Sequence, residues 1–212
     1  MTPDVEVSPL QQGIDCTRLR ERVTDDRVRD AMQSVMRHVF VREEVQMSAY
    51  LDVESPVGHG RRCPQPSVAA LMVEAAEPAP GTQVAVLAAG TGYLSALLAQ
   101  IGCVVTSVES NACLREAGAA AILQIGLASR VSWTAELGDG DAGRFDAIVV
   151  GAGVARPPRP WTAWLRPGGR LVVPVAQRRL AMLTVMGRDG SQVTRREVGV
   201  VPIHCLDRAP RT

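Results

Sequence analysis

Residues 83–110 read QVAVLAAGTGYLSALLAQIGCVVTSVES, and the prediction of the architecture starts from them. The two ends of this stretch, 83–89 and 103–109, are apolar and rich in valine, a composition that favours strands. Between them, 94–102 carries leucine and alanine in a run that suits a helix. A strand, a helix and a second strand in succession predict a parallel pair of strands joined by a crossover helix.

The same alternation continues after residue 110. The predicted elements are a helix at 111–126, a strand at 130–136, a strand at 145–152, a helix at 161–165 and a strand at 170–175. The stretches 180–187 and 193–201 then alternate like an antiparallel pair that closes the sheet. We therefore expect an α/β fold, a doubly wound and mostly parallel sheet with helices on both faces.

The residues before this core predict a helical elaboration beside the sheet. Residues 24–39 show helical spacing, and Thr24 or Asp25 can cap this helix. A weaker helix is expected between 9 and 22. Glycines and prolines make irregular structure the expectation for 40–66.

Length and composition predict one globular domain over 1–212. Apolar residues make up 46% of the chain and charged residues 21%. The helices and a loop at 1–66 would pack beside a core at 67–212. That core would begin with a helix at 67–77 capped by Ser67.

All 23 basic residues of the chain are arginine, and lysine is absent. No Schiff-base lysine and no phosphate-binding P-loop lysine is therefore possible. Any catalytic base or fixed cation must come from histidine, arginine, a carboxylate, a thiol or the backbone.

Charge and hydropathy favour neither a nucleic acid nor a membrane as partner. The formal net charge is +1, and no apolar run approaches the roughly 18 residues of a membrane span. The start, MTPDVEVSPLQQG, lacks the basic and apolar segments of a signal peptide. The five cysteines form no CxxC pair, which predicts reduced thiols in the cytoplasm.

A turn of small residues ends the first predicted strand. It consists of Ala88, Ala89, Gly90, Thr91, Gly92 and Tyr93. Ligands of doubly wound sheets bind at the carboxyl ends of the strands, where small residues permit a close approach. Glu109 and Ser110 follow the second strand, and an acid there can accept hydrogen bonds from two ribose hydroxyls. The pattern predicts a nucleoside-binding site.

The spacing of this turn favours a nucleoside without phosphate groups. NAD and FAD folds carry GxGxxG, with the pyrophosphate at a helix N-terminus. AAGTGYLS, residues 88–95, lacks that spacing, which argues against a dehydrogenase. A cofactor such as S-adenosyl-L-methionine fits better.

Residues 83–110 resemble the cofactor-binding core of class I methyltransferases. Upstream, VESPVGHGRRCPQPSVAALMVEAAEPAPG (53–81) resembles the segment that marks the protein-L-isoaspartate O-methyltransferase family. FDAIVVGAG (145–153) and LRPGGRLVVPV (165–175) are similar to later strands of that family. The chain from Leu10 to Asp52 and the tail VPIHCLDRAPR resemble its bacterial branch.

This resemblance implies a Rossmann-like methyltransferase sheet that binds S-adenosyl-L-methionine. The methyl acceptor would be a carboxylate of a damaged protein or a related acceptor. The cofactor residues would be Ala88, Ala89, Gly90, Thr91, Gly92, Tyr93, Glu109 and Ser110, with Glu136 or Asp139 near the adenine. The substrate-side loop would begin at Gly58, His59 and Gly60 and end at Gln65 and Pro66.

The sequence departs from the pattern of the family at five positions, one of which is Thr91, in place of a usual small residue of the turn. Val86 replaces an acid of the first strand, and Ala88 replaces the first glycine of the turn. Arg62 and Pro64 stand where the family has hydroxyl groups. Arg61 and Arg62 can either hold an anionic substrate in a bidentate grip or face solvent.

Other chemistry-bearing residues have structural alternatives. His59 can orient a substrate or act as a base, or it can bond the backbone. Cys63 is a candidate nucleophile without an obvious base. Asp139 and Asp141 suit a solvated turn better than a metal site, so no metal is expected. Trp161 and Trp164 can pack in the core or line a pocket.

These observations leave three alternatives for the function. The first is an active methyltransferase that acts on a damaged protein or a small molecule. The second is a degenerate, non-catalytic member that binds nucleoside weakly, as Val86, Ala88 and Pro64 would suggest. The third is another nucleoside-binding α/β enzyme.

Overall fold

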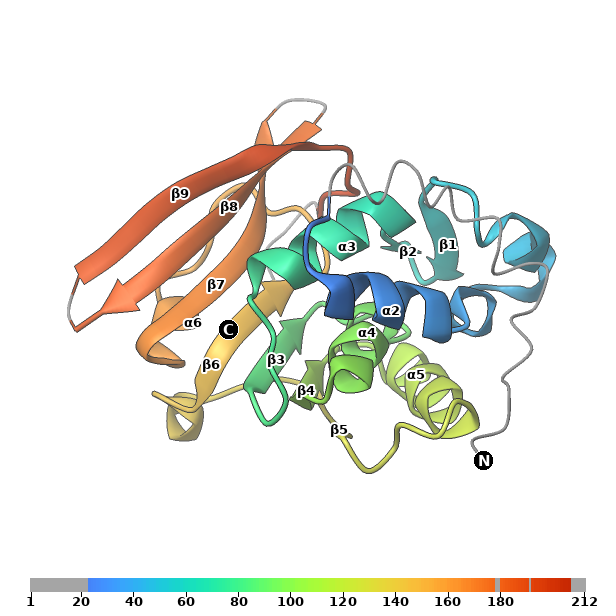
Figure 1. Ribbon diagram of the computed structural model, residues 1–212, viewed down its shortest axis with the longest axis horizontal. Helices are drawn as coiled ribbons and strands as arrows, with labels where there is room; N and C mark the ends of the chain where they lie inside the picture. Colours follow the sequence, from blue (N-terminus) through green and yellow to red (C-terminus); the bar gives the residue numbers. More distant parts are fainter. Residues whose placement is uncertain (1–22, 178–179, 191, 207–212) are drawn as a thin grey trace.

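The computed structural model describes residues 23–177, 180–190 and 192–206 (Figure 1). Its main sheet contains seven strands. In sheet order they are β5 (Val131–Thr134), β4 (Val104–Val108), β3 (Gln83–Leu87), β6 (Phe145–Val150), β7 (Leu165–Gln177), β8 (Leu180–Asp189) and β9 (Gln192–Val201).

The strand order reverses at the centre of the sheet. The chain runs outward from β3 through β4 to β5 and then returns to place β6 on the other side of β3. The five strands from β5 to β7 are parallel to their neighbours, whereas β8 and β9 add an antiparallel pair. The predicted doubly wound, mostly parallel sheet is confirmed.

The helices cover the two faces of the sheet unequally. One large hydrophobic cluster joins one face to α2 (Asp26–Ser34), α3 (Pro66–Ala75), α4 (Tyr93–Ile101) and α5 (Ala112–Gln124). A second, smaller hydrophobic cluster lies on the opposite face. Among the described residues, the only α-helix on that face is the short α6 (Pro160–Ala163), whose Trp161 packs in this cluster. The prediction of helices on both faces is therefore confirmed, although the second face carries far less helix than the first (Figure 1).

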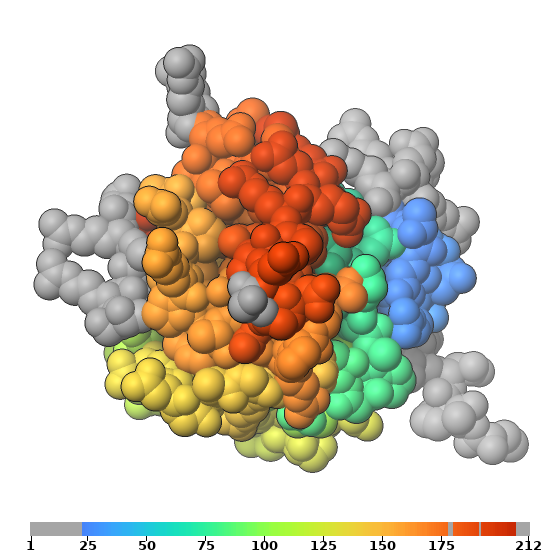
Figure 2. Space-filling model, turned by 90° about the vertical axis from the view of Figure 1, so that its left-hand side faces the viewer, coloured from blue at the N-terminus to red at the C-terminus, as the bar shows by residue number. Residues whose placement is uncertain are grey.

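The burial of the strands agrees with the sequence pattern in the centre of the sheet but not in its last strand. In β3 every residue from Val84 to Leu87 is buried, as expected for a parallel strand covered on both faces. In β9, by contrast, Val193, Val198 and Val200 are exposed. Strands β8 and β9 face the viewer in Figure 2. The alternation at 193–201 predicted the strand but does not produce a buried face.

The N-terminal helix is shorter than the predicted span of 24–39. Asp25 caps α2 by accepting a hydrogen bond from the Arg27 backbone, and the helix ends at Ser34. The chain then forms a 3₁₀ helix at Arg37–Phe40. Helical spacing continues beyond the true end because Val35 still packs inward from an extended backbone. The predicted helix at 9–22 lies outside the described residues.

The segment predicted to be irregular contains more order than expected. A second 3₁₀ helix spans Glu43–Ser48. Strands β1 (Ser55–Gly58) and β2 (Arg61–Cys63) then form an antiparallel hairpin. These elements connect α2 to α3.

Ser67 does not cap α3, so that prediction is wrong. Gln65 holds the N-cap position, and Pro66 is the first helical residue. The backbone N–H of Ser67 instead donates to the Asp52 carboxylate at 2.9 Å. A free backbone N–H in the first turn of α3 is therefore bound by a carboxylate from fifteen positions earlier in the chain.

Strand β7 begins five residues earlier than the predicted strand at 170–175. Phe145 pairs with Leu165 and Ala147 with Arg170, so the Pro167–Gly169 turn forms a bulge within the strand. No helix in the described ranges is long and apolar enough to cross a membrane.

Candidate functional site

The chain turns sharply after β3 through several left-handed residues. The backbone angle φ is 52° at Ala88, 57° at Gly90 and 90° at Gly92. Glycine adopts this region freely, whereas alanine is strained there by about 1–2 kcal/mol. Ala88 therefore occupies a position whose geometry favours glycine.

Neighbouring segments pack directly against this turn. A Cβ atom on Gly151, just after β6, would lie 2.7 Å from the carbonyl oxygen of Ala88. A Cβ atom on Gly118 of α5 would lie 2.3 Å from the ring of Trp133 and 3.0 Å from the carbonyl oxygen of Thr91. These close approaches hold the turn between the end of β6 and the surface of α5.

Glu109 connects the turn to the next strand. Only 1% of its surface is exposed. Its Oε2 accepts a hydrogen bond from the Gly90 backbone at 3.0 Å, and its Oε1 accepts one from the Asn111 backbone at 3.1 Å. The Arg61 Nη2 atom lies 3.5 Å from the same Oε1 atom. A buried carboxylate needs such donors, and here they come from three separate segments.

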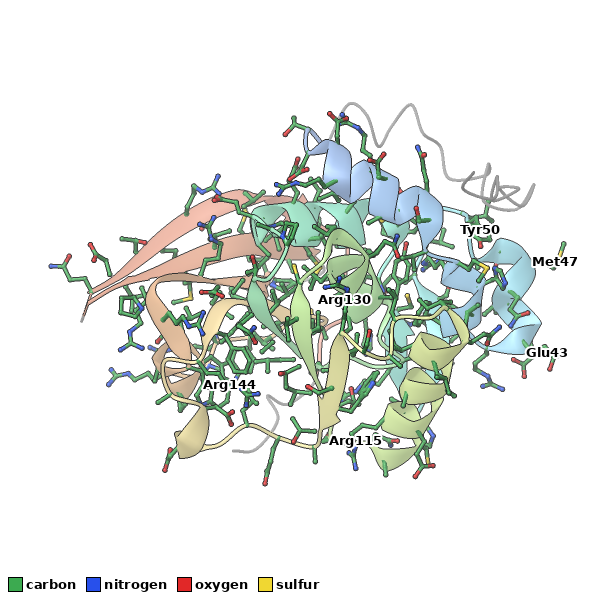
Figure 3. All side chains as sticks on the ribbon, turned by 60° about the horizontal axis from the view of Figure 1, so that its bottom comes forward. Glu43, Met47, Tyr50, Arg115, Arg130 and Arg144 are labelled. Atoms are coloured by element: carbon green, nitrogen blue, oxygen red, sulfur yellow. The ribbon has the colours of Figure 1, made fainter. Side chains whose placement is uncertain are left out.

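A second arginine fixes the backbone beside this carboxylate. Arg115, labelled in Figure 3, lies in the first turns of α5. Its Nη1 donates to the carbonyl oxygen of Glu109 at 2.7 Å and to that of Ser110 at 2.9 Å. Arg115 therefore ties the end of β4 to α5.

A cavity of about 390 Å³ opens at the carboxyl ends of these strands. Its volume lies in the range of about 300–1,000 Å³ found for small-molecule sites. Its wall brings together the predicted site residues Arg61, Ala88, Glu109, Ser110, Glu136 and Asp139. Much of the remaining wall is apolar: Leu87, Val108, Leu137, Pro160, Trp161 and Trp164.

Both candidates for the adenine end, Glu136 and Asp139, are exposed residues of this wall. Because both line the same cavity, their positions do not choose between them, and the role of each near the adenine stays a prediction. Trp161 and Trp164 satisfy both of their alternatives, since they are buried and also line the cavity. The Trp164 Nε1 atom donates to the Gly138 carbonyl at 3.1 Å, which fixes its ring.

The sequence interpretation missed Leu137 and Pro160 as parts of the wall. Both lie where the chain leaves or approaches a strand on the cavity side: Leu137 after β5 and Pro160 at the start of α6. Their closeness to the strand ends was a usable signal, but neither carries a polar group that would attract attention.

The predicted substrate-side loop is the β1–β2 hairpin. Its tip, Gly58, His59 and Gly60, has positive φ at every residue. His59 is exposed and lies outside the wall of the main cavity. A catalytic role for His59 therefore stays a prediction that needs a substrate to reach the tip.

Two neighbouring arginines on β2 have different surroundings. Arg61 has 24% of its side chain exposed and lines the main cavity beside Glu109. Arg62 is exposed and borders a crevice of about 10 Å³. Other residues of that crevice come from the turn: Ala89, Gly90, Thr91 and Tyr93. Of the two alternatives for these side chains, the solvent-facing one describes Arg62, whereas Arg61 reaches into the predicted site.

The residues that end the predicted substrate-side loop, Cys63 to Gln65, lie outside the wall of the main cavity. The Gln65 Nε2 atom donates to the Ser67 hydroxyl at 3.2 Å, and Gln65 lies outside the wall of the main cavity. Cys63 and Pro64 are buried. Burial raises the pKa of the Cys63 thiol, which argues against a thiolate nucleophile. A catalytic role for Gln65 stays a prediction.

Arg37 holds the hairpin in place, and sequence reasoning missed it. Its side chain is fully buried, and its guanidinium donates to the carbonyl oxygens of Ala49, Val53 and Pro64. The group also lies over the Tyr93 ring, 5.5 Å from the ring centroid. The sequence around Arg37 does not indicate this role, because the residues that it binds lie 12 to 27 positions away in the chain.

The turn is anchored to the same N-terminal segment by its own side chains. The Thr91 hydroxyl donates to the Phe40 carbonyl at 2.5 Å. The Tyr93 ring is buried against Phe40, with 5.8 Å between the ring centroids. Tyr93 thus turns its ring away from the main cavity, and burial raises the pKa of its hydroxyl.

Sequence comparison now assigns the chain to a family. The family model described as protein-L-isoaspartate(D-aspartate) O-methyltransferase matches residues 12–208. The chain belongs to this family. A protein-L-isoaspartate O-methyltransferase from Roseiflexus is 39% identical over 173 residues, which are 79% of this chain and 78% of the relative. Another from Methanoregula boonei is 33% identical over 198 residues, or 90% of this chain and 89% of the relative. The predicted family and its methyltransferase activity are thereby confirmed.

Solved structures agree with the fold of this methyltransferase. A protein-L-isoaspartate O-methyltransferase from Plasmodium falciparum, in complex with S-adenosyl-L-homocysteine, superposes with a TM-score of 0.78. It is 19% identical, and the match covers 93% of this chain and 97% of that one. At this identity the likeness confirms the fold alone.

The departures of this methyltransferase from its family have distinct structural settings. Val86 is fully buried in the centre of β3 and lines neither cavity. Ala88 borders both cavities. The Pro64 carbonyl oxygen accepts a hydrogen bond from Arg37, and the Arg62 side chain is exposed to solvent. The two positions where the resemblance implies hydroxyl groups are therefore occupied by a buried proline and an exposed arginine.

We predict that Ala88→Gly stabilises the protein by up to about 1.5 kcal/mol. The substitution removes left-handed strain of about 1–2 kcal/mol but adds unfolded-state entropy worth about 0.4–1 kcal/mol. Chemical denaturation measures the free energy of unfolding. Ala89→Gly is the matched control, because Ala89 has no positive φ and should lose about 0.4–1 kcal/mol. Equal losses in both variants would contradict the strain at Ala88.

We predict that Arg37→Met lowers the free energy of unfolding by at least about 2 kcal/mol, because three carbonyl oxygens lose a charged donor. Arg42→Met removes an exposed arginine from the neighbouring segment, with 55% of its side chain exposed. That control should change stability by no more than about 0.5 kcal/mol. Similar effects of the two substitutions in chemical denaturation would show that the Arg37 contacts contribute little.

Proposed function

We propose that this chain transfers the methyl group of S-adenosyl-L-methionine (AdoMet) to a carboxylate oxygen of an isoaspartyl residue in a damaged protein. Family membership supports the reaction. The observation that supports the site is the buried Glu109 carboxylate, held at the end of β4 in the wall of the cavity.

The cavity suits the nucleoside end of this cofactor. Glu109 can accept from ribose hydroxyls, since its donors are two backbone N–H groups and Arg61, and the Arg61 contact is the longest of the three at 3.5 Å. Trp161, Trp164 and Leu137 supply apolar surface for a planar base. Glu136 or Asp139 would accept from the adenine amino group.

The turn would hold the amino acid end of the cofactor through its backbone. Ala88, at the start of this turn, borders the main cavity. Val86, buried in β3, provides no carboxylate for an amino group there. We therefore expect binding to depend more strongly on Glu109 than it would with an acid at position 86.

The acceptor side would rely on orientation and charge. AdoMet, when bound, supplies an electrophilic methyl group. An acceptor carboxylate is already ionised at neutral pH, so the protein needs no strong base to activate it. Arg61 can orient that carboxylate, and the apolar wall excludes water that would solvate it. Loss of the family hydroxyls at Arg62 and Pro64 is compatible with this chemistry.

We also propose that the protein works in the cytoplasm. In support, none of Cys63, Cys103 and Cys113 forms a disulfide. Free thiols are typical of proteins from reducing compartments.

We predict that Glu109→Ala weakens binding of AdoMet and of S-adenosyl-L-homocysteine (AdoHcy) by about 1–3 kcal/mol, the range for hydrogen bonds to a charged group. Isothermal titration calorimetry measures this directly. Glu116→Ala removes an exposed carboxylate from α5 and should leave the affinity unchanged. Unchanged affinity in Glu109→Ala would mean that the ribose lies elsewhere.

We predict transfer of labelled methyl from AdoMet to a peptide that contains isoaspartate, and none to the same peptide with ordinary aspartate. If the cofactor binds but neither peptide is labelled, the acceptor is a different molecule, such as a small carboxylate. If neither AdoMet nor AdoHcy binds at millimolar concentration, the chain is a non-catalytic member of its family.

A further inference from the structure

One carboxylate serves two parts of the proposed site. Glu109 would take the ribose hydroxyls of the cofactor. Arg61, which would orient the acceptor, contacts that same carboxylate at 3.5 Å, and both side chains line the main cavity. Cofactor and acceptor therefore draw on one pair of side chains.

The hydrogen-bonding capacity of Glu109 limits what it can hold at once. A carboxylate offers about four lone-pair sites. The backbone N–H groups of Gly90 and Asn111 take two of them at 3.0 and 3.1 Å, and Arg61 takes a third at 3.5 Å. Two ribose hydroxyls would bring the demand to five donors. One existing donor must then yield, and Arg61 has the longest contact and the most mobile donor group.

The yielding side chain has other donors to offer. A guanidinium carries five N–H groups. Within the described part of the chain, Glu109 is the only recorded hydrogen-bond or ion-pair partner of the Arg61 side chain. A carboxylate that enters the cavity can therefore form a bidentate pair with Arg61 once the contact with Glu109 loosens.

We propose that Arg61 is a specificity-determining residue that couples cofactor binding to recognition of an anionic acceptor. This inference rests on the proposed function. Ribose hydroxyls on Glu109 weaken its pairing with Arg61, which makes the guanidinium available to the acceptor carboxylate. Because coupling between two ligands is reciprocal, an acceptor on Arg61 also frees Glu109 for the ribose.

The proposal predicts a change opposite in sign to that of a structural role. If Arg61 merely stabilised Glu109, its removal would weaken cofactor binding. If Arg61 competes with the ribose, its removal strengthens cofactor binding while weakening the acceptor. The affinity for AdoHcy in the absence of acceptor therefore separates the two roles.

The experiment uses calorimetry on the full chain with AdoHcy alone, with the isoaspartyl peptide alone, and with each in the presence of the other. We expect Arg61→Gln to bind AdoHcy about two- to fivefold more tightly than the unmodified protein, the range for a partly exposed ion pair. The factor by which AdoHcy tightens peptide binding should fall by a similar amount. Arg61→Lys keeps the charge and should retain most of the coupling.

Arg62→Gln is the matched control, because it removes the same charge from the next residue of the same strand. It should leave the coupling factor intact, since Arg62 is exposed and lies outside the main cavity. Weaker or equal AdoHcy binding by Arg61→Gln, or equal loss of coupling in both variants, would overturn the proposal while leaving the methyltransferase function in place. No AdoHcy binding by the unmodified protein would overturn both.

Discussion

The buried carboxylate of Glu109 is the constraint on which the site depends. A charge with only 1% of its surface exposed must be surrounded by donors, or folding would carry a large desolvation penalty. Its donors are the Gly90 backbone in the turn after β3 and the Asn111 backbone at the start of α5. The same requirement that satisfies the charge therefore fixes the relative positions of two strand ends.

The proposed acceptor side is held differently, because a buried cation there binds several carbonyl groups. Arg37 donates to Ala49, Val53 and Pro64, so the hairpin and the segment before it take their positions from one side chain. Its stacking over Tyr93 links this assembly to the first turn of α4. The proposed cofactor and acceptor sides are therefore joined by Arg37, through its contact with Tyr93, and by Arg61 in the cavity wall.

The sequence predicted the features that depend on residues close together in the chain. It did not predict contacts between residues that are far apart in the chain. Strands at 83–89 and 103–109, the turn between them and Glu109 follow from short-range patterns that recur in doubly wound sheets. The cap of α3 could not be predicted, because Asp52 reaches Ser67 across an intervening hairpin. The predicted helix at 24–39 was too long, because spacing alone cannot distinguish a helical residue from one that packs inward on an extended backbone.

The same division applies to the candidate site. Six predicted residues share the cavity wall because their positions at strand ends and on β2 converge there. His59 and Gln65 carry suitable chemistry but lie outside that wall, since the conformation of a hairpin decides which side chains face a site. The different surroundings of Arg61 and Arg62 illustrate this, because consecutive strand residues point to opposite sides.

The absence of lysine matters at two positions rather than throughout the chain. Arg37 is fully buried and donates to three carbonyls. A buried ammonium group tends to lose its proton, whereas a guanidinium keeps its charge and has enough donors for several acceptors. Arg61 also needs several donors if it is to leave one carboxylate for another. A coding bias toward arginine can explain most of the 23 basic residues, but at these two positions the chemistry of the guanidinium itself favours arginine over lysine.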